Sequence, residues 1–67
     1  MSKMEYRVYF HNVGEVVKMS KIFSMMNMST TNFYRFLKSE EYDWCMSEEL
    51  LESIKQTTER VVLEKLT

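Results

Sequence analysis

The sequence has few residues that break helices and few that could cross-link a fold. Its 67 residues include no proline, one glycine (Gly14), one cysteine (Cys45) and one histidine (His11). A single cysteine excludes an internal disulfide, and His11 with Cys45 supplies too few ligands for a structural zinc site. A domain of this size buries only about 60% of its unfolded surface. Stability must therefore come from an apolar core, from self-association or from both.

Long apolar runs are also missing. No stretch approaches the roughly 18 apolar residues that a membrane-spanning helix needs. Met1–Arg7 is not followed by the apolar region of a signal peptide. The unpaired thiol of Cys45 fits a reducing compartment. We therefore expect a cytoplasmic protein with no membrane partner.

No group of residues has the pattern of a catalytic or metal site. His11 has no nucleophile within a recognisable motif, and Cys45, beside Trp44, is predicted to be a half-buried apolar residue. The acidic residues Glu40, Glu41 and Asp43 are predicted to form a solvated loop, because two or three carboxylates are weak evidence for a cation site. We expect no enzymatic activity, no metal and no cofactor.

Charge is distributed unevenly, although the formal net charge is only −1. Residues 1–14 carry a net charge of +1, residues 15–39 carry +3 and residues 40–67 carry −5. A basic middle segment favours contact with nucleic acid, and an acidic end favours solvent or a protein partner. The basic side chains of the middle segment are Lys18, Lys21, Arg35 and Lys38.

Apolar residues of the first segment recur at helical spacing. Intervals of three or four residues separate Tyr6, Phe10, Val13 and Val17. A strand is the alternative for residues 4–13, since Tyr6, Val8 and Phe10 alternate with the residues between them. We predict a helix because the helical spacing continues past Phe10, and a break at Gly14.

Two further short helices are predicted in the middle of the chain. The first is a short amphipathic helix that ends at Asn27, a residue type that enters the left-handed conformation at little cost. Its apolar residues are Met19, Ile22, Phe23, Met25 and Met26. The second runs from Thr30 to about Lys38 with Ser29 as N-cap. Its inward residues are predicted to be Phe33, Phe36 and Leu37, with Met28 and Phe33 spaced as a hydrophobic staple.

The C-terminal third begins with residues 39–46, which lack periodicity and are predicted to be a loop carrying aromatic anchors. A last helix over residues 48–66 follows, with Ser47 as N-cap and Glu48 and Glu49 at the positive end of the helix dipole. Met46 and Leu51 form another staple-like pair. The apolar stripe of this helix consists of Leu50, Leu51, Ile54, Val61, Val62 and Leu66. The predicted fold is therefore all-α, a single domain over residues 1–67 with four helices, or between three and five.

Residues 19–38 have the spacing of a helix-turn-helix, in which two short helices are joined by a tight turn. Ile22 and Met26 occupy the inner face of the first helix, and Met28 plugs the turn. Phe33 and Phe36 face back from the second helix. The residues left to face outward or along the turn are Ser29, Thr30, Thr31, Asn32, Tyr34, Arg35 and Lys38.

This segment, MSKIFSMMNMSTTNFYRFLK, resembles the helix-turn-helix of phage-repressor and Cro-like regulators. In that family the turn often reads glycine, an aliphatic residue, then serine or threonine, and here it is Asn27-Met28-Ser29. The recognition helix often ends in Ser-Arg followed by apolar residues, and here it ends in residues 34–38. The capped segment from Ser47 looks like the fourth helix that supports the motif. The resemblance covers residues 19–38 well and the rest of the chain loosely.

Two departures from the family concern the crossing of the helices. Phe23 stands where the family has a small residue, and Phe33 replaces a small aliphatic one. We expect the bulk of Phe23 to force a wider crossing, or its ring to point elsewhere.

The residues predicted to face outward from the helix-turn-helix are suited to binding double-stranded DNA. Asn32 can form a bidentate pair with adenine, and Arg35 can pair with guanine or bind a phosphate. The hydroxyls of residues 29–31 can donate to phosphate oxygens beside the free N–H groups of the helix start. The side chains predicted to neutralise phosphates are Lys18, Lys21 and Lys38. The resemblance implies a sequence-specific transcriptional regulator of phage or mobile-element type, such as a repressor.

The alternative function is a small protein-binding inhibitor or antirepressor that keeps a helix-turn-helix shape. Its support is the acidic C-terminal third together with Tyr42, Trp44, Met46 and the surplus of methionines. A homodimer through the C-terminal helix is also predicted, since the polar residues 55–60 separate two apolar halves and the second half needs a partner. The alternative is that Val61 and Val62 pack against the first helix.

Overall fold

The computed structural model describes residues 1–66, with side chains through residue 65. Its elements are α1 (Lys3–Val13), α2 (Met19–Met25), α3 (Thr31–Lys38), the 3₁₀ helix η1 (Glu40–Cys45) and α4 (Glu48–Leu66). No strand occurs within residues 1–66, so the all-α prediction is confirmed. None of these helices combines the length and the apolar character needed to cross a membrane.

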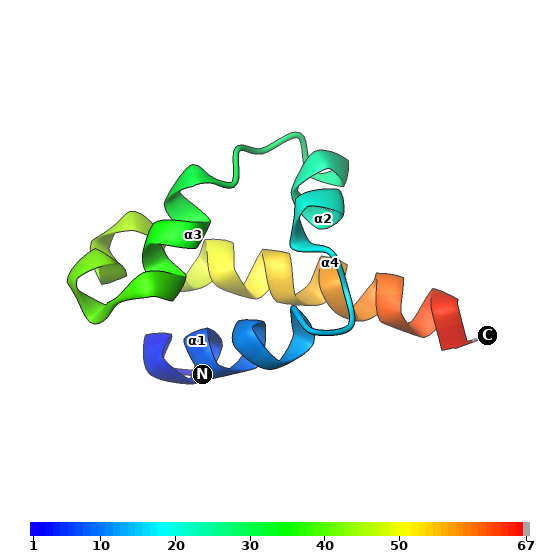
Figure 1. Cartoon of the computed structure of the whole chain (residues 1–67), viewed down its shortest axis with the longest axis horizontal. Coiled ribbons are helices and arrows are strands. Elements are labelled where there is room, and N and C mark those ends of the chain that lie inside the picture. The colour runs from blue at the N-terminus through cyan, green and yellow to red at the C-terminus, as the bar shows by residue number, and fades with distance from the viewer. Residues whose placement is uncertain (67) are drawn as a thin grey trace.

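α1 and α4 lie along the long axis of the molecule, and α2 and α3 lie above them, joined by an arched connection (Figure 1). The backbone of α2 packs mainly against α4, whereas α3 packs against α1 and η1. The C-terminal end of α4 projects beyond the other helices (Figure 1).

The first segment is a helix and not the alternative strand. Ser2 and Glu5 form a capping box, in which the Ser2 hydroxyl accepts from the Glu5 N–H and the Glu5 carboxylate accepts from the Ser2 N–H. Tyr6 and Phe10 are buried. Gly14 caps the C-terminal end of the helix, and a Cβ there would make a tight contact of 3.0 Å with the Phe10 carbonyl oxygen.

The core is formed by side chains from all four α-helices. The predicted cluster is confirmed: Ile22, Phe33 and Phe36 are fully buried, and Met26 and Met28 are half-buried against them. The Phe10 ring meets the Phe33 ring edge-on, with centroids 5.1 Å apart. The contribution of α4 comes from Leu51, Ile54, Thr58 and Val61.

The predicted loop at residues 39–46 is wrong in its backbone and in its anchors. Residues 40–45 form η1, with the Ser39 hydroxyl accepting from the Glu41 N–H. Trp44 is 73% exposed and Tyr42 half-buried, so Met46, at 2% exposure, is the anchor. Asp43 is not simply solvated, because its carboxylate pairs with Arg7.

α4 begins as predicted, with the Leu50 N–H donating to the Ser47 hydroxyl at 3.1 Å. The polar interruption at residues 55–60 contains a core residue, since Thr58 is fully buried and its hydroxyl donates to the Ile54 carbonyl oxygen at 2.8 Å. Val61 therefore continues the same buried stripe into the chain's own core. The side chain of Leu66, also part of the predicted stripe, lies outside the described residues.

Candidate functional site

The turn between α2 and α3 is closed by backbone hydrogen bonds of the Schellman type. The Met28 N–H donates to the Phe23 carbonyl oxygen at 2.9 Å, and the Asn27 N–H donates to that of Ser24 at 3.1 Å. Asn27 has φ 56°, the only positive φ of a residue other than glycine in the described chain. The predicted left-handed end of the helix is therefore confirmed, at the position where the resembling family often has glycine.

Ser29 precedes the N-cap of α3, Thr30, which makes no side-chain capping hydrogen bond, so the predicted N-cap is wrong by one residue. The Ser29 hydroxyl accepts from the Thr31 N–H at 3.2 Å and donates to the Thr31 hydroxyl at 3.1 Å. One of the backbone donors that a helix start leaves without an intrahelical partner is thereby satisfied. Ser29 therefore supports the chain where the turn enters α3.

Phe23 and Phe33, the two residues that are bulkier than their counterparts in the resembling family, pack against each other. Phe23 is 1% exposed, and its ring centroid lies 4.7 Å from that of Phe33. Of the two expectations for Phe23, an outward ring is wrong. The contact between these two rings joins α2 to α3. The backbones of α2 and α3 are not among the helix pairs that pack closely along their length.

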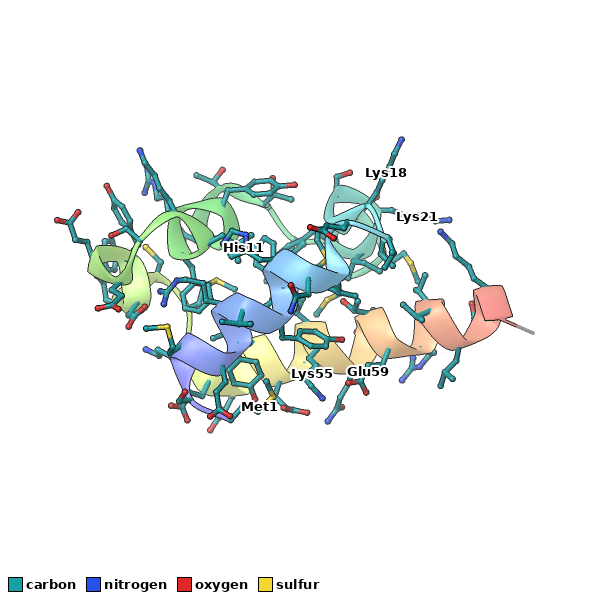
Figure 2. All side chains as sticks on the ribbon, turned by 60° about the horizontal axis from the view of Figure 1, so that its bottom comes forward. Met1, His11, Lys18, Lys21, Lys55 and Glu59 are labelled. Carbon is teal, nitrogen blue, oxygen red and sulfur yellow. The ribbon has the colours of Figure 1, made fainter. Side chains whose placement is uncertain are left out.

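α3 presents a polar outer face over a buried aromatic one. Phe33 and Phe36 are fully buried, whereas Tyr34 and Arg35 between them are exposed. Eight of the nine residues predicted to contact DNA are exposed and Thr30 is half-buried: Ser29, Thr30, Thr31, Asn32, Tyr34, Arg35, Lys38, Lys18 and Lys21. Lys18 and Lys21 extend away from the body on the same side (Figure 2).

The segment that forms most of this surface is basic, although the exposed Glu15 lines a hollow together with Lys18 and Tyr34. Residues 16–39 contain four basic side chains and no acidic one. Within the described part of the chain, none of these four forms an ion pair. The ion pairs found there join Arg7 to Asp43 and Lys55 to Glu59.

A polar hollow of about 540 Å³ lies between α2 and the turn. Its lining residues are Ser20, Ser24, Asn27, Met28, Ser29 and Thr30. Ser20 and Ser24 were not among the residues predicted to contact DNA. Because the two serines are four residues apart in a predicted helix, the sequence could have placed them on one face.

Arg7 holds the C-terminal end of α3, and sequence reasoning missed this role. The residue is 9% exposed, and its guanidinium donates to the carbonyl oxygens of Phe36 at 2.8 Å and Ser39 at 3.4 Å. It also pairs with the Asp43 carboxylate. Phe36 and Ser39 lie about one turn apart at the end of α3, and Asp43 lies in η1, so Arg7 fixes both elements against α1.

The residues that could support catalysis or metal binding are dispersed over the structure. His11 is exposed, and its Nε2 lies 3.1 Å from the Leu37 carbonyl oxygen. Cys45 is half-buried, as predicted. Within residues 1–66 no group of three or more His, Cys, Asp or Glu side chains is placed to hold a metal ion.

None of the protein-family models, curated proteins or solved structures compared with this chain matches it.

Proposed function

We propose that the chain is a small sequence-specific DNA-binding regulator that uses α3 as its recognition helix. The observation that carries this proposal is the surface over residues 16–39. It combines exposed basic side chains with an exposed polar face on α3, and the segment itself contains no acidic residue, with Glu15 at its border. DNA binding requires both features, since charge neutralisation supplies affinity and base-edge contacts supply specificity.

In this proposal α3 lies in the major groove with its N-terminal residues toward the base edges. Asn32 pairs with an adenine, and Arg35 with a guanine or a phosphate. The hydroxyls of Ser20, Ser24 and Thr30, which line the hollow beside the turn, donate to phosphate oxygens. Lys18, Lys21 and Lys38 neutralise the backbone on either side.

The remaining parts of the chain support that surface. α4 and α1 supply the core on which α2 and α3 rest, and Arg7 fixes the end of α3. We propose that the protein acts in the cytoplasm as a homodimer, without enzymatic activity or cofactor. Two copies would place two recognition helices on two half-sites and so raise the affinity of a small domain.

A second function is favoured by Trp44, which is 73% exposed on η1 beside the exposed Glu40 and Glu41. Large aromatic side chains are enriched at the centres of protein interfaces. This acidic face therefore suits a protein partner, as expected of an inhibitor or antirepressor. It lies on a different element from the basic surface, so the two functions predict different sensitive residues.

Titration with mixed-sequence duplex DNA at two salt concentrations tests the proposal. We expect binding at low salt that weakens steeply as salt rises, because each neutralised phosphate releases counterions. A Trp44→Ala variant is the matched control and should bind DNA as the native chain does. Absence of binding at low salt would reject the DNA proposal in favour of the protein-binding function.

A further inference from the structure

The hollow that Glu15 lines with Lys18 and Tyr34 lies where α1, α2 and α3 meet, at the border of the proposed DNA-binding surface. Its volume is about 380 Å³, and the buried Phe10 and Val17 contribute to its lining. We refer to it as the His11 hollow. Its exposed polar side chains are His11, Glu15, Lys18, Ser20 and Tyr34. Lys18 and Tyr34 belong to the residues proposed to contact DNA, so the hollow is part of that surface.

His11 is held against α3 by a hydrogen bond. It lies in the last turn of α1, and its Nε2 is 3.1 Å from the carbonyl oxygen of Leu37, in the last turn of α3 (Figure 2). Because a carbonyl oxygen only accepts, Nε2 carries a hydrogen in this contact, and a further proton binds at Nδ1. The contact is therefore compatible with the neutral and with the charged ring, and the ring keeps its place in both.

The groups that face His11 differ from it in their response to pH. Glu15 comes from the turn after α1, Lys18 from the start of α2 and Tyr34 from α3. Arg7, one turn earlier on α1, is paired with Asp43. Carboxylates, ammonium groups and phenols ordinarily keep their charge between pH 5.5 and 8, whereas imidazole ordinarily changes its charge within this range. The charge of the hollow therefore depends on pH through His11.

A phosphate at the edge of this hollow lies within reach of that charge. A space of 380 Å³ is roughly 7 Å across, which is shorter than the Debye length of about 10 Å at 0.1 M salt. A backbone phosphate bound by Lys18 or Tyr34 is thus attracted by a protonated His11. The same phosphate is repelled by the Glu15 carboxylate, which is the acidic group of this hollow.

We propose that protonated His11 is a fifth cationic group of the DNA-binding surface and acts on a backbone phosphate, so that DNA binding strengthens as the pH falls from 8 to 5.5. The inference rests on the proposed function and adds regulation by pH to the same surface. By linkage, a phosphate that favours the imidazolium makes the complex take up a proton. Glu15 limits the affinity at both ends of this pH range.

Fluorescence anisotropy with a labelled mixed-sequence duplex tests the proposal at pH 8 and pH 5.5, each at two salt concentrations. The native chain should bind about three- to tenfold more tightly at pH 5.5, with a salt dependence steeper by up to about one counterion. His11→Gln keeps an N–H that can donate to Leu37 but does not titrate, and it should lack this pH dependence. His11→Lys carries its charge at both pH values and should bind at both as the native chain does at pH 5.5.

Glu15→Gln tests the place of the hollow without a change of pH. Binding should strengthen about threefold or more at both pH values, because a carboxylate beside the phosphate is removed. The matched control is Glu49→Gln, which removes an exposed carboxylate from the start of α4 and should have a much smaller effect. Circular dichroism at both pH values establishes that each variant keeps native helix content.

The outcomes separate this inference from the proposed function. A native chain that binds no duplex at either pH would reject DNA binding and the role of His11 together. Three results would overturn the role of His11 while leaving DNA binding in place. They are equal native constants at the two pH values, a His11→Gln variant with the native pH dependence, and a Glu15→Gln variant with native affinity.

Discussion

The guanidinium of Arg7 lies over the ring of Phe36, 4.4 Å from its centroid, while its Nε donates to the Phe36 carbonyl oxygen at 2.8 Å. One side chain of α1 thus contacts both the ring and the backbone of a single residue of α3. The contact satisfies a carbonyl at the end of α3, where helices leave acceptors unpaired, and favours a positive charge there. The orientation of α3 therefore depends on α1 as well as on its own buried rings.

Replacement of Arg7 by methionine should destabilise the fold by about 2 kcal/mol. Methionine retains the apolar stem but removes the charge-assisted hydrogen bonds, each of which contributes roughly 1.5–3 kcal/mol. Part of this loss is offset because Nη1 of Arg7 is buried without a partner. Urea unfolding measures the change, with the exposed Arg60→Met as control, for which about 0.5 kcal/mol or less is expected. An Arg7→Met variant of native stability would show that the contact does not stabilise the fold.

Truncation of Phe36 to alanine should cost about 3–5 kcal/mol, because the ring is fully buried and its removal leaves a cavity. A domain of this size would then be largely unfolded. Tyr34, two positions earlier on α3 and half exposed, is the matched control, and Tyr34→Ala should change the melting temperature little. A Phe36→Ala variant that melts near the native temperature would contradict the packing of α3 described above.

The helices were predictable because their signals are local. Ser47 caps α4, the Ser29 hydroxyl accepts from the first N–H of α3, and Asn27 takes the left-handed conformation that ends α2. Each of these features depends on hydrogen bonds and backbone preferences within a few residues. The buried aromatic face of α3 was likewise predictable, because the helical spacing of its apolar residues is visible within that segment alone.

The errors come from contacts between distant residues. Arg7 meets partners 29 to 36 residues away, and nothing in α1 distinguishes it from a solvated arginine. Thr58 was grouped with polar residues because its burial depends on the packing of α4 against the other helices, although its hydroxyl is satisfied locally by the Ile54 carbonyl oxygen. Trp44 was expected to be one of the aromatic anchors of residues 39–46, yet it is exposed and Met46 takes the buried position.

Substitution of Asn27 tests the turn between α2 and α3. Asn27→Gly should leave stability unchanged or raise it slightly, since glycine adopts φ 56° without steric cost. Asn27→Val should lower it by about 1–2 kcal/mol, because a β-branched residue is strained in that region. Urea midpoints of the two variants measure the difference. Equal midpoints would contradict the left-handed conformation at this position.

The hydrogen bond between Tyr6 and Glu52 should make stability depend on pH at both extremes. The Tyr6 hydroxyl donates to Glu52 Oε1 at 2.5 Å. This bond, and next the one from Gln56, lowers the pKa of Glu52 below its usual 4.5. The same bond, followed by burial, raises the pKa of Tyr6 from 10.0 to about 12.

The pKa shifts of Glu52 and Tyr6 make stability depend on pH in two separate ranges. The contribution of Glu52 is complete above its usual pKa and is lost as the pH falls through the lower folded value. That of Tyr6 is complete below pH 10 and is lost between pH 10 and about 12. Tyr6→Phe should weaken both dependences of the melting temperature. Part of the acid dependence should remain in this variant, because hydrogen bonds from Ser2 lower the pKa of Glu5. Part of the alkaline dependence should also remain, because burial raises the pKa of Tyr9. Melting curves that match the native chain at both extremes would contradict the role of this pair.

The last prediction concerns the contribution of Arg35 to DNA binding. Arg35 is exposed on the outer face of α3, one turn after Thr31, within a segment that has no acidic residue. If it pairs with a base edge, Arg35→Ala should weaken binding to the preferred duplex by about 1–3 kcal/mol and relax specificity at one position. Lys38→Ala should instead weaken all sequences alike and reduce the salt dependence by about one counterion. Glu48→Lys, at the start of α4, is the control for charge at a distance and should have a much smaller effect than Arg35→Ala. Fluorescence anisotropy on a selected and a scrambled duplex distinguishes these outcomes, and an Arg35→Ala variant that binds both duplexes as the native chain does would exclude α3 as the recognition helix.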